Sequence, residues 1–132
     1  MNIFFDVDFT LITWNYRLRP HVHEVFRRLQ DDGHDVYLWS GVGKRWEVVE
    51  QFALQDLIVD CFEKPLWGHV ARLPELGITV RPDFVVDDHD EPVLVFGGAV
   101  IQPPESPLDG DTEMLRIYES IQAFAALRTS PP

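Results

Sequence analysis

Two aspartates spaced two residues apart follow the first apolar stretch of the chain. Residues 3–5 are Ile and Phe, and they lead directly into Asp6 and Asp8. A short apolar run that ends in acids is typical of a buried strand in a parallel sheet, whose carboxyl end lies at the edge where ligands bind. Two crowded carboxylates raise the pKa of at least one of them unless a cation lies between them. The opening therefore predicts either a metal site or a pair of acids that shares a proton.

Polar side chains recur where three later apolar runs end. Because the carboxyl ends of parallel strands meet at one edge of a sheet, we expect these side chains to lie near Asp6 and Asp8. The fourth run passes directly into acids, as the first does, so it is predicted to be the partner strand of the first. The residues at these three ends are Ser40 with Gly41, Lys64, and Asp87 with Asp88.

These groups together can carry out phosphoryl transfer, which needs an in-line nucleophile, a cation and donors for the phosphate oxygens. Asp6 can attack phosphorus to give an aspartyl phosphate. Asp8 can protonate the leaving oxygen and then deprotonate water. Ser40 and the neighbouring Gly41 N–H can bind phosphate oxygens, and Lys64 can tie the phosphate to Asp6.

Asp87 and Asp88 are the predicted ligands of a divalent cation. Carboxylate oxygens are hard ligands, which favours Mg²⁺ over zinc. The sequence leaves open which of the two aspartates binds the metal directly. It also leaves open a simple turn before Pro92, although the apolar run that precedes the acids favours the metal site.

Several neighbouring residues have alternative roles. Ser40 can cap the helix that follows it, which is compatible with phosphate binding at a helix N-terminus. Lys44 could reach the site in place of Lys64. His89 could tune the acids beside it, although a solvated loop histidine is the commoner case. Asp90 either assists the site or is solvated.

Apolar runs alternate with helical patterns along the whole chain. Each connection is long enough for a crossover, which implies right-handed βαβ units in a parallel sheet covered on both faces. The sequence therefore predicts one three-layer α/β domain over residues 1–132, with a central, mainly parallel sheet of about five strands.

The individual elements can be placed from the same patterns. The expected strands begin at Ile3 and lie at residues 35–39, 57–61, 83–86 and within 92–101. The expected helices begin at Pro20, follow Gly43, and lie at residues 66–73 and 112–128. The second helix is expected to bury Trp46, Val49, Phe52 and Ala53. An irregular loop is expected at residues 103–110 and a frayed tail at 129–132.

The acidic composition limits the expected partners. The 132-residue chain has 11 Lys and Arg against 22 Asp and Glu, a formal charge of −11. Because this charge repels phosphate backbones and anionic membranes, neither nucleic acid nor a membrane surface is an expected partner. The single cysteine, Cys61, is predicted to be a buried strand thiol, which fits a reducing cytoplasm. With no leader pattern and no apolar run of bilayer length, we expect neither export nor membrane insertion.

The order of these motifs resembles that of the haloacid dehalogenase (HAD) superfamily of phosphatases and phosphotransferases. Residues 6–11 match the family's first motif, Asp-x-Asp-x-Thr. Ser40 matches the second motif and Lys64 the third, and Asp87 with Asp88 matches the acidic fourth motif. The resemblance covers nearly the full length of the chain, and the four motifs in this order are quite specific.

The resemblance implies a role for each matched residue. Asp6 would be the nucleophile, Asp8 the general acid and base, and Thr10 a supporting residue. Mg²⁺ would be bound by the Asp6 carboxylate, the Asp8 main-chain carbonyl and the fourth motif, with Asp88 as the favoured ligand over Asp87. The implied fold is a Rossmann-like sheet in which the fourth-motif strand flanks the first strand.

Members of this family normally control access with a cap domain, for which this chain has little room. Only residues 13–19 separate the first strand from its helix, and residues 64–87 hold little more than a helix and a connector. The chain therefore resembles a capless member with an open site, which suits bulky substrates or is covered by a second copy in a homo-oligomer. Trp14, Tyr16 and Arg17 are candidates for the substrate-side rim, with Arg17 as a phosphate or carboxylate contact.

We therefore expect a cytoplasmic, Mg²⁺-dependent phosphatase that acts through an aspartyl phosphate on a small-molecule or protein-borne phosphomonoester. Phosphotransfer would use the same residues. One alternative is a receiver-like phospho-acceptor signalling domain, but such domains have the acidic pair first and the phosphorylated Asp on a middle strand. Another alternative is a catalytically silent HAD-like binding module, which the presence of every core residue disfavours.

Overall fold

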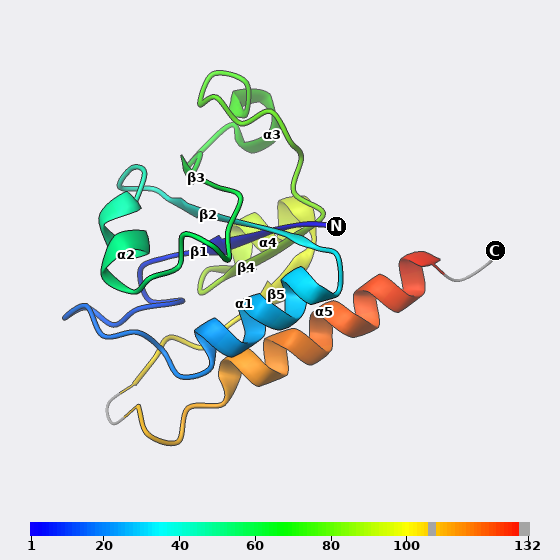
Figure 1. The fold of residues 1–132 in the computed structure, drawn as a ribbon. Helices are drawn as coiled ribbons and strands as arrows, with labels where there is room; N and C mark the ends of the chain where they lie inside the picture. Colours follow the sequence, from blue (N-terminus) through cyan, green and yellow to red (C-terminus); the bar gives the residue numbers. More distant parts are fainter. Residues whose placement is uncertain (106–107, 130–132) are drawn as a thin grey trace.

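A five-stranded, all-parallel sheet with helices on both faces forms the centre of the computed structural model (Figure 1), which confirms the predicted three-layer α/β class. The structure describes residues 1–105 and 108–129. Residues 106–107 of the expected loop and 130–132 of the expected tail lie outside the described residues. The strands are β1 (Asn2–Asp6), β2 (Asp35–Ser40), β3 (Asp60–Glu63), β4 (Phe84–Asp87) and β5 (Gly98–Val100). The helices are α1 (Val22–Asp31), α2 (Trp46–Gln51), α3 (His69–Arg72), α4 (Asp90–Phe96) and α5 (Glu113–Thr129).

The strand order β3-β2-β1-β4-β5 places the first and fourth strands side by side, as the sequence predicted. Phe5 of β1 pairs with Val86 of β4, so the two strands end at the same level. Successive strands run outward from β1 in one direction and outward from β4 in the other. Such a switch point leaves a crevice at the carboxyl ends of the strands, where ligands bind in open α/β sheets. Asp6 and Asp87 are the last residues of these two strands.

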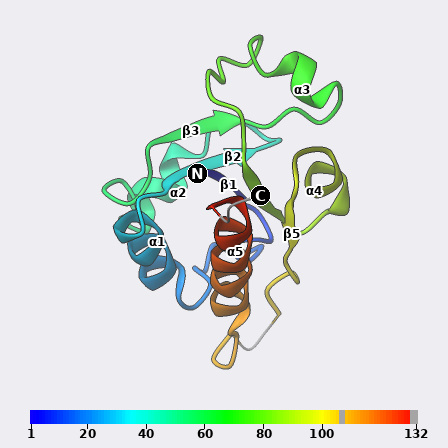
Figure 2. The same ribbon diagram turned by 90° about the vertical axis from the view of Figure 1, so that its right-hand side faces the viewer.

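The sheet buries an apolar cluster on each face because side chains alternate along a strand. Phe5 packs on one face with residues of α1, α2 and α5, and Phe4 packs on the other with Tyr37 and Trp39. Figures 1 and 2 show α1 and α5 side by side on one side of the strands, with α3 on the opposite side. Residues of α4 and of the segment after α3 cover the second cluster.

The third strand lies later in the chain than residues 57–61, so that prediction was wrong in its bounds. Leu57 is buried, but it belongs to a turn, and β3 begins at Asp60. Residues 57–61 are mostly apolar because residues of both a turn and a strand pack into the core there. The periodicity of the sequence does not distinguish a buried turn from a buried strand. Cys61 is buried within β3, which confirms the predicted strand thiol.

The segment 92–101 holds less strand than its composition predicted. Its first part belongs to α4, and only Gly98–Val100 is a strand. Pro92 lies in the first turn of α4, where its missing N–H has no intrahelical partner to lose. Gly97, with φ of 88°, ends the helix and lets the chain turn into β5.

Two helices also differ from their expected form. The predicted helix at 66–73 is reduced to the four residues of α3. Val49 of α2 is buried as expected, together with Val48, and Phe52 just after the helix is half-buried. Trp46 and Ala53, which lies beyond the end of α2, are exposed, contrary to expectation. Since α2 is only six residues long, Val48 and Val49 are the two side chains that it buries. None of the helices in the described ranges is long and apolar enough to cross a membrane.

Gly98 is required by the close approach of β5 to β4. Its φ is 146°, and a Cβ atom there would lie 1.9 Å from the Val85 carbonyl oxygen. We therefore expect Gly98→Ala to destabilise the fold by about 2 kcal/mol or more, measured by urea denaturation. Gly110→Ala is the matched control, because a Cβ at Gly110 meets nothing within 4 Å. Equal stability of the two variants would contradict the role of Gly98.

Candidate active site

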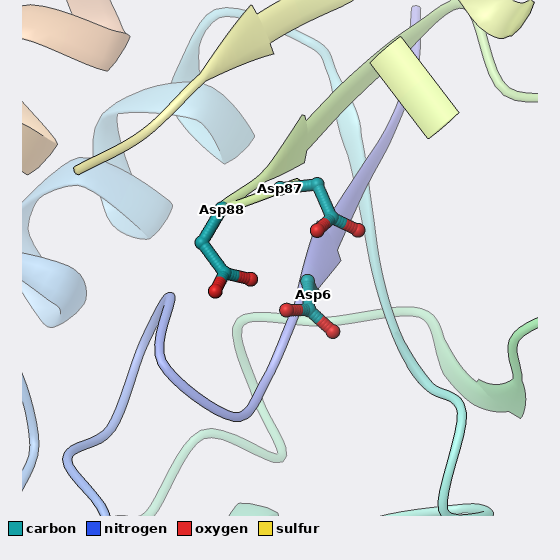
Figure 3. A group of neighbouring side chains, drawn as sticks. All are labelled: Asp6, Asp87 and Asp88. Atoms are coloured by element: carbon teal, nitrogen blue, oxygen red, sulfur yellow. The ribbon is translucent and has the colours of Figure 1, made fainter. Parts of the chain in front are cut away.

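Three carboxylates converge at the switch point between β1 and β4. Asp6 ends β1, Asp87 ends β4, and Asp88 follows it. Figure 3 shows the three side chains grouped at the ends of β1 and β4. One oxygen from each carboxylate lies within 4.8 Å of the others, close enough for the three to share one metal ion. The structure thus brings together the acids of the first and fourth apolar runs.

Lys64 lies between two of these acids. Its Nζ is 3.1 Å from Asp6 Oδ1 and 2.9 Å from Asp87 Oδ2, and the side chain is buried. The residue follows β3 directly, and its backbone N–H donates to the Ser40 carbonyl oxygen at the end of β2. This hydrogen bond fixes the backbone position from which the Lys64 side chain extends. Lys44, the alternative from sequence, is exposed and does not line the cavity described below.

The charges in this cluster do not balance. Burial and the neighbouring Asp87 raise the pKa of Asp6 to about 8. Although burial works against the charged amine, Asp6 and Asp87 raise the pKa of Lys64. If all three carboxylates were ionised, the cluster with the Lys64 ammonium would carry a formal charge of −2. A divalent cation would neutralise this charge, and hard carboxylate oxygens are the ligands that Mg²⁺ prefers.

Hydrogen bonds hold two of the carboxylates in place. Thr10 is fully buried, and its Oγ1 donates to Asp6 Oδ2 at 3.2 Å. The His89 backbone N–H donates to Asp87 Oδ1 at 2.9 Å. Both Asp87 oxygens therefore accept a hydrogen bond, one from Lys64 and one from His89. Asp88 lies within 4.8 Å of the other two carboxylates, and the exposed His89 ring is near it as well, with Nε2 4.0 Å from Oδ2.

Asp8 lines the same cavity as Asp6, but its carboxylate is not one of the three that converge. Its Oδ2 accepts a hydrogen bond from Ser40 Oγ at 3.1 Å, and its Oδ1 lies 2.9 Å from Arg45 Nη2. The chain leaves the strand after Asp6 and turns, with the Leu11 N–H donating to the Val7 carbonyl. That turn places the Asp8 carboxylate outside the group formed by Asp6, Asp87 and Asp88. The sequence had predicted that the carboxylates of Asp6 and Asp8 would converge.

Arg45 was missed by the sequence analysis. Its side chain is mostly buried, and Nη2 contacts both Asp8 and the hydroxyl of Tyr16 at 3.0 Å. The residue lies between β2 and α2, and the only signal in the sequence is a cation a few positions after a strand end. Its partners are 37 and 29 residues away in the chain, so no local pattern connects them.

A cavity of about 590 Å³ joins these groups. The acids and Lys64 lie at one part of its wall, and apolar side chains form much of the rest. Gly41 also lines it, and a Cβ at that position would lie 2.6 Å from Leu66 Cδ2. The lining residues are Asp6, Asp8, Phe9, Trp14, Tyr16, Ser40, Gly41, Val42, Arg45, Lys64, Leu66, Asp88 and His89.

Of the three expected rim residues, two line this cavity and one does not. Trp14 and Tyr16 are part of its wall. Arg17 instead lines a separate hollow with Thr13 and Leu108, so it does not contact the acidic cluster. The backbone N–H of Arg17 donates to Thr13 Oγ1, which closes a tight turn. Because of this turn, Arg17 does not line the same cavity as Tyr16. Asp90 begins α4 and does not line the cavity.

No protein-family model and no curated protein matches the sequence. The resemblance to the HAD superfamily therefore stays a prediction carried by the motif residues. What the structure adds is that the residues of all four motifs lie around one cavity at the carboxyl edge of a parallel sheet.

Proposed function

We propose that this chain is a Mg²⁺-dependent phosphohydrolase that acts through a phosphorylated Asp6. One observation carries the proposal: Asp6, Asp87 and Asp88 converge within 4.8 Å while Lys64 bridges two of them. A nucleophilic carboxylate next to a cation site and an ammonium group is what attack on an anionic phosphate requires.

The first half-reaction transfers the phosphoryl group to the protein. An Asp6 oxygen attacks phosphorus and forms a new P–O bond as the bond to the leaving oxygen breaks. Asp8, in its protonated form, gives its proton to that oxygen. In the second half, Asp8 takes a proton from water, the resulting hydroxide attacks phosphorus, and inorganic phosphate leaves with Asp6 restored.

The remaining polar residues bind and orient the phosphate. Lys64 lies beside Asp6 and can pair with a phosphate oxygen while it holds the nucleophile. Ser40 and the Gly41 N–H line the cavity at the end of β2 and can donate to the other oxygens. Ser40 also donates to Asp8, so the acid and the phosphate-binding hydroxyl are positioned together.

The acidic cluster would hold the metal ion. Mg²⁺ there would supply positive charge that offsets the repulsion between a carboxylate nucleophile and an anionic phosphate. Asp6 and Asp87 each already accept hydrogen bonds at both oxygens, from Thr10 and Lys64 and from Lys64 and His89, so we assign Asp88 as the direct ligand from the fourth motif. This assignment chooses between the two aspartates that the sequence left open.

The strand order favours this proposal over a receiver-like signalling domain. Receiver-type sheets follow the flavodoxin-like order 2-1-3-4-5, whereas this chain follows 3-2-1-4-5. The segments around the site also support an open cavity, because α3 is the one helix between Lys64 and Asp87. An open cavity is compatible with small-molecule and protein-borne phosphomonoesters.

Hydrolysis by the purified chain tests the proposal. With Mg²⁺ present, we expect release of inorganic phosphate from both aryl and alkyl phosphomonoesters, and we expect exhaustive chelation to abolish it. Restoring Mg²⁺ should restore turnover. A protein that becomes phosphorylated on Asp6 without release of phosphate would instead support the receiver-like alternative. Turnover that survives chelation would contradict the metal role of the cluster.

A further inference from the structure

Large apolar side chains form part of the wall of the cavity. Phe9, Trp14 and Tyr16 line it, together with Val42 and Leu66, and all five are exposed. Trp14 is 79% exposed. Exposed apolar side chains that gather around a polar site mark a place where a ligand is bound. The volume of about 590 Å³ is that of a small-molecule site.

Two of these aromatic residues have unusual backbone conformations. Phe9 has φ of 62° and Tyr16 has φ of 60°. In the part of the chain that the structure describes, only two other non-glycine residues have positive φ, His21 and Ala53. A bulky side chain in this region is strained, and such strain concentrates at functional sites. Glycine would adopt the same backbone freely, so replacing Phe9 with glycine removes the ring without adding strain to the turn.

The Tyr16 ring is tied to the acid that serves the leaving group. Arg45 Nη2 donates to Tyr16 Oη at 3.0 Å and contacts Asp8 Oδ1 at 2.9 Å, so one nitrogen links the two side chains. In the proposed reaction Asp8 protonates the leaving oxygen. The aromatic wall therefore lies where the rest of the leaving group extends from the phosphate.

The charges around the wall do not favour an anionic leaving group. Among the cavity residues, the cations Lys64 and Arg45 are both already paired with carboxylates. Arg45 also contacts Glu47, at 3.1 Å. A second phosphate or a carboxylate on the leaving group would lie beside Asp8, and Arg45, the cation next to Tyr16, is already shared between Asp8 and Glu47. A neutral ring is the group that this wall fits.

We infer that the substrate is an aryl phosphate, a phosphomonoester whose leaving oxygen is attached to an aromatic ring that stacks on Phe9 and Tyr16. The inference rests on the proposed function for the phosphate end and adds the chemical class of the leaving group. Aromatic side chains recognise a planar ring through offset-stacked and edge-to-face contacts that a saturated ring does not reproduce.

Binding of phosphonates tests the inference without turnover, because their carbon–phosphorus bond is not hydrolysed. With Mg²⁺ present, calorimetry is expected to show phenylphosphonate bound about tenfold more tightly than methylphosphonate, and more tightly than cyclohexylphosphonate. In Phe9→Gly the preference for phenyl over methyl is expected to fall by about fivefold. An unchanged preference in this variant, or no preference in the wild type, would overturn the inference.

Ala53→Gly is the matched control for the change of backbone. Ala53 also has positive φ, is exposed and lies outside the cavity. We expect this variant to keep the wild-type phenyl preference. Phe9→Gly is expected to melt no lower than the wild type, since the strained residue is replaced by one that adopts the same φ freely. A lost preference in Ala53→Gly would attribute the effect to the backbone and would overturn the inference.

Hydrolysis of phosphotyrosine and phosphoserine separates this inference from the proposed function. Phosphoserine turned over as fast as phosphotyrosine would overturn the aryl assignment and leave the phosphatase proposal intact. No turnover of either, with the phenyl preference present and dependent on Phe9, would overturn the phosphatase proposal and leave the ring-binding wall intact. A phosphotyrosine peptide compared with the free amino acid identifies whether the aryl phosphate is protein-borne or free.

Discussion

Replacing Asp6 with asparagine is expected to lower phosphatase activity by about 10³-fold or more, because the amide has no charged oxygen with which to attack phosphorus. The asparagine keeps the size of the side chain and an oxygen that can accept from Thr10 or Lys64, which now contact the carboxylate at 3.2 and 3.1 Å. The measurement is the rate of phosphate release at saturating Mg²⁺. Wild-type turnover in the purified variant would reject Asp6 as the nucleophile.

The same substitution is not expected to unfold the chain. Asp6 is one of three crowded carboxylates and shares Lys64 with Asp87, so loss of its charge relieves repulsion at the switch point. We expect its melting temperature in the absence of divalent cations to be no lower than that of the wild type. A large drop would show that lost activity reflects a lost fold.

Asp83→Asn is the matched control for a change of charge on the same sheet. Asp83 lies just before β4, at the end opposite to the site, where its carboxylate accepts from the Asn2 N–H at 2.7 Å and pairs with Arg128. It does not line the cavity. We expect this variant to keep the wild-type rate of phosphate release, so that an equal loss in both variants would contradict a specific role for Asp6.

The positions of the acids could be predicted because they depend on rules that act locally and on topology. Apolar runs that end in Asp6 or in Asp87 mark strands by their composition, and a parallel sheet brings strand ends to one edge whatever the details of the loops. Lys64 follows from the same rule, since it lies directly after β3. These are the parts of the site that the backbone alone determines.

The parts that were missed depend on how loops place side chains. Asp8 lies one residue beyond the point where the chain leaves β1, and the turn there directs it to Ser40 and Arg45. A pairing across 32 or 37 residues leaves no periodic signal. The same reason explains why Arg17 was a wrong rim candidate, since it lies one residue after Tyr16 but faces a different hollow.

Replacing Arg19 with methionine is expected to destabilise the fold by about 3–5 kcal/mol. The side chain is 1% exposed, and its Nε contacts both oxygens of Asp111, at 3.0 and 3.1 Å. It also donates to the carbonyl oxygens of Thr10, at 2.9 Å, and of Gln102. Methionine fills similar volume but leaves a mostly buried carboxylate and two carbonyls without this partner. Urea denaturation measures the loss.

The loss of Arg19 is expected to affect the active site as well, because Arg19 holds the turn after β1. That turn contains Thr10, which contacts the nucleophile Asp6. The carbonyl of Thr10 accepts from Arg19, and the hydroxyl of Thr10 donates to Asp6. We therefore expect the folded fraction of Arg19→Met to hydrolyse phosphomonoesters more slowly than the wild type. Full activity per folded molecule would show that the turn keeps Asp6 in place without the arginine.

Two further variants show whether the unpaired charge causes the loss of stability. Asp111→Asn in the Arg19→Met background removes the charge but keeps an oxygen for the Glu113 N–H, which now donates to Asp111 Oδ1 at 3.1 Å. This double variant should recover about 1–2 kcal/mol. Arg28→Met is the control, because its exposed pair with Glu24 is worth less than about 1 kcal/mol. If Arg19→Met lowered the free energy of unfolding no more than Arg28→Met does, the result would contradict the prediction. The buried Arg19–Asp111 pair would then not be what joins the turn after β1 to the start of α5.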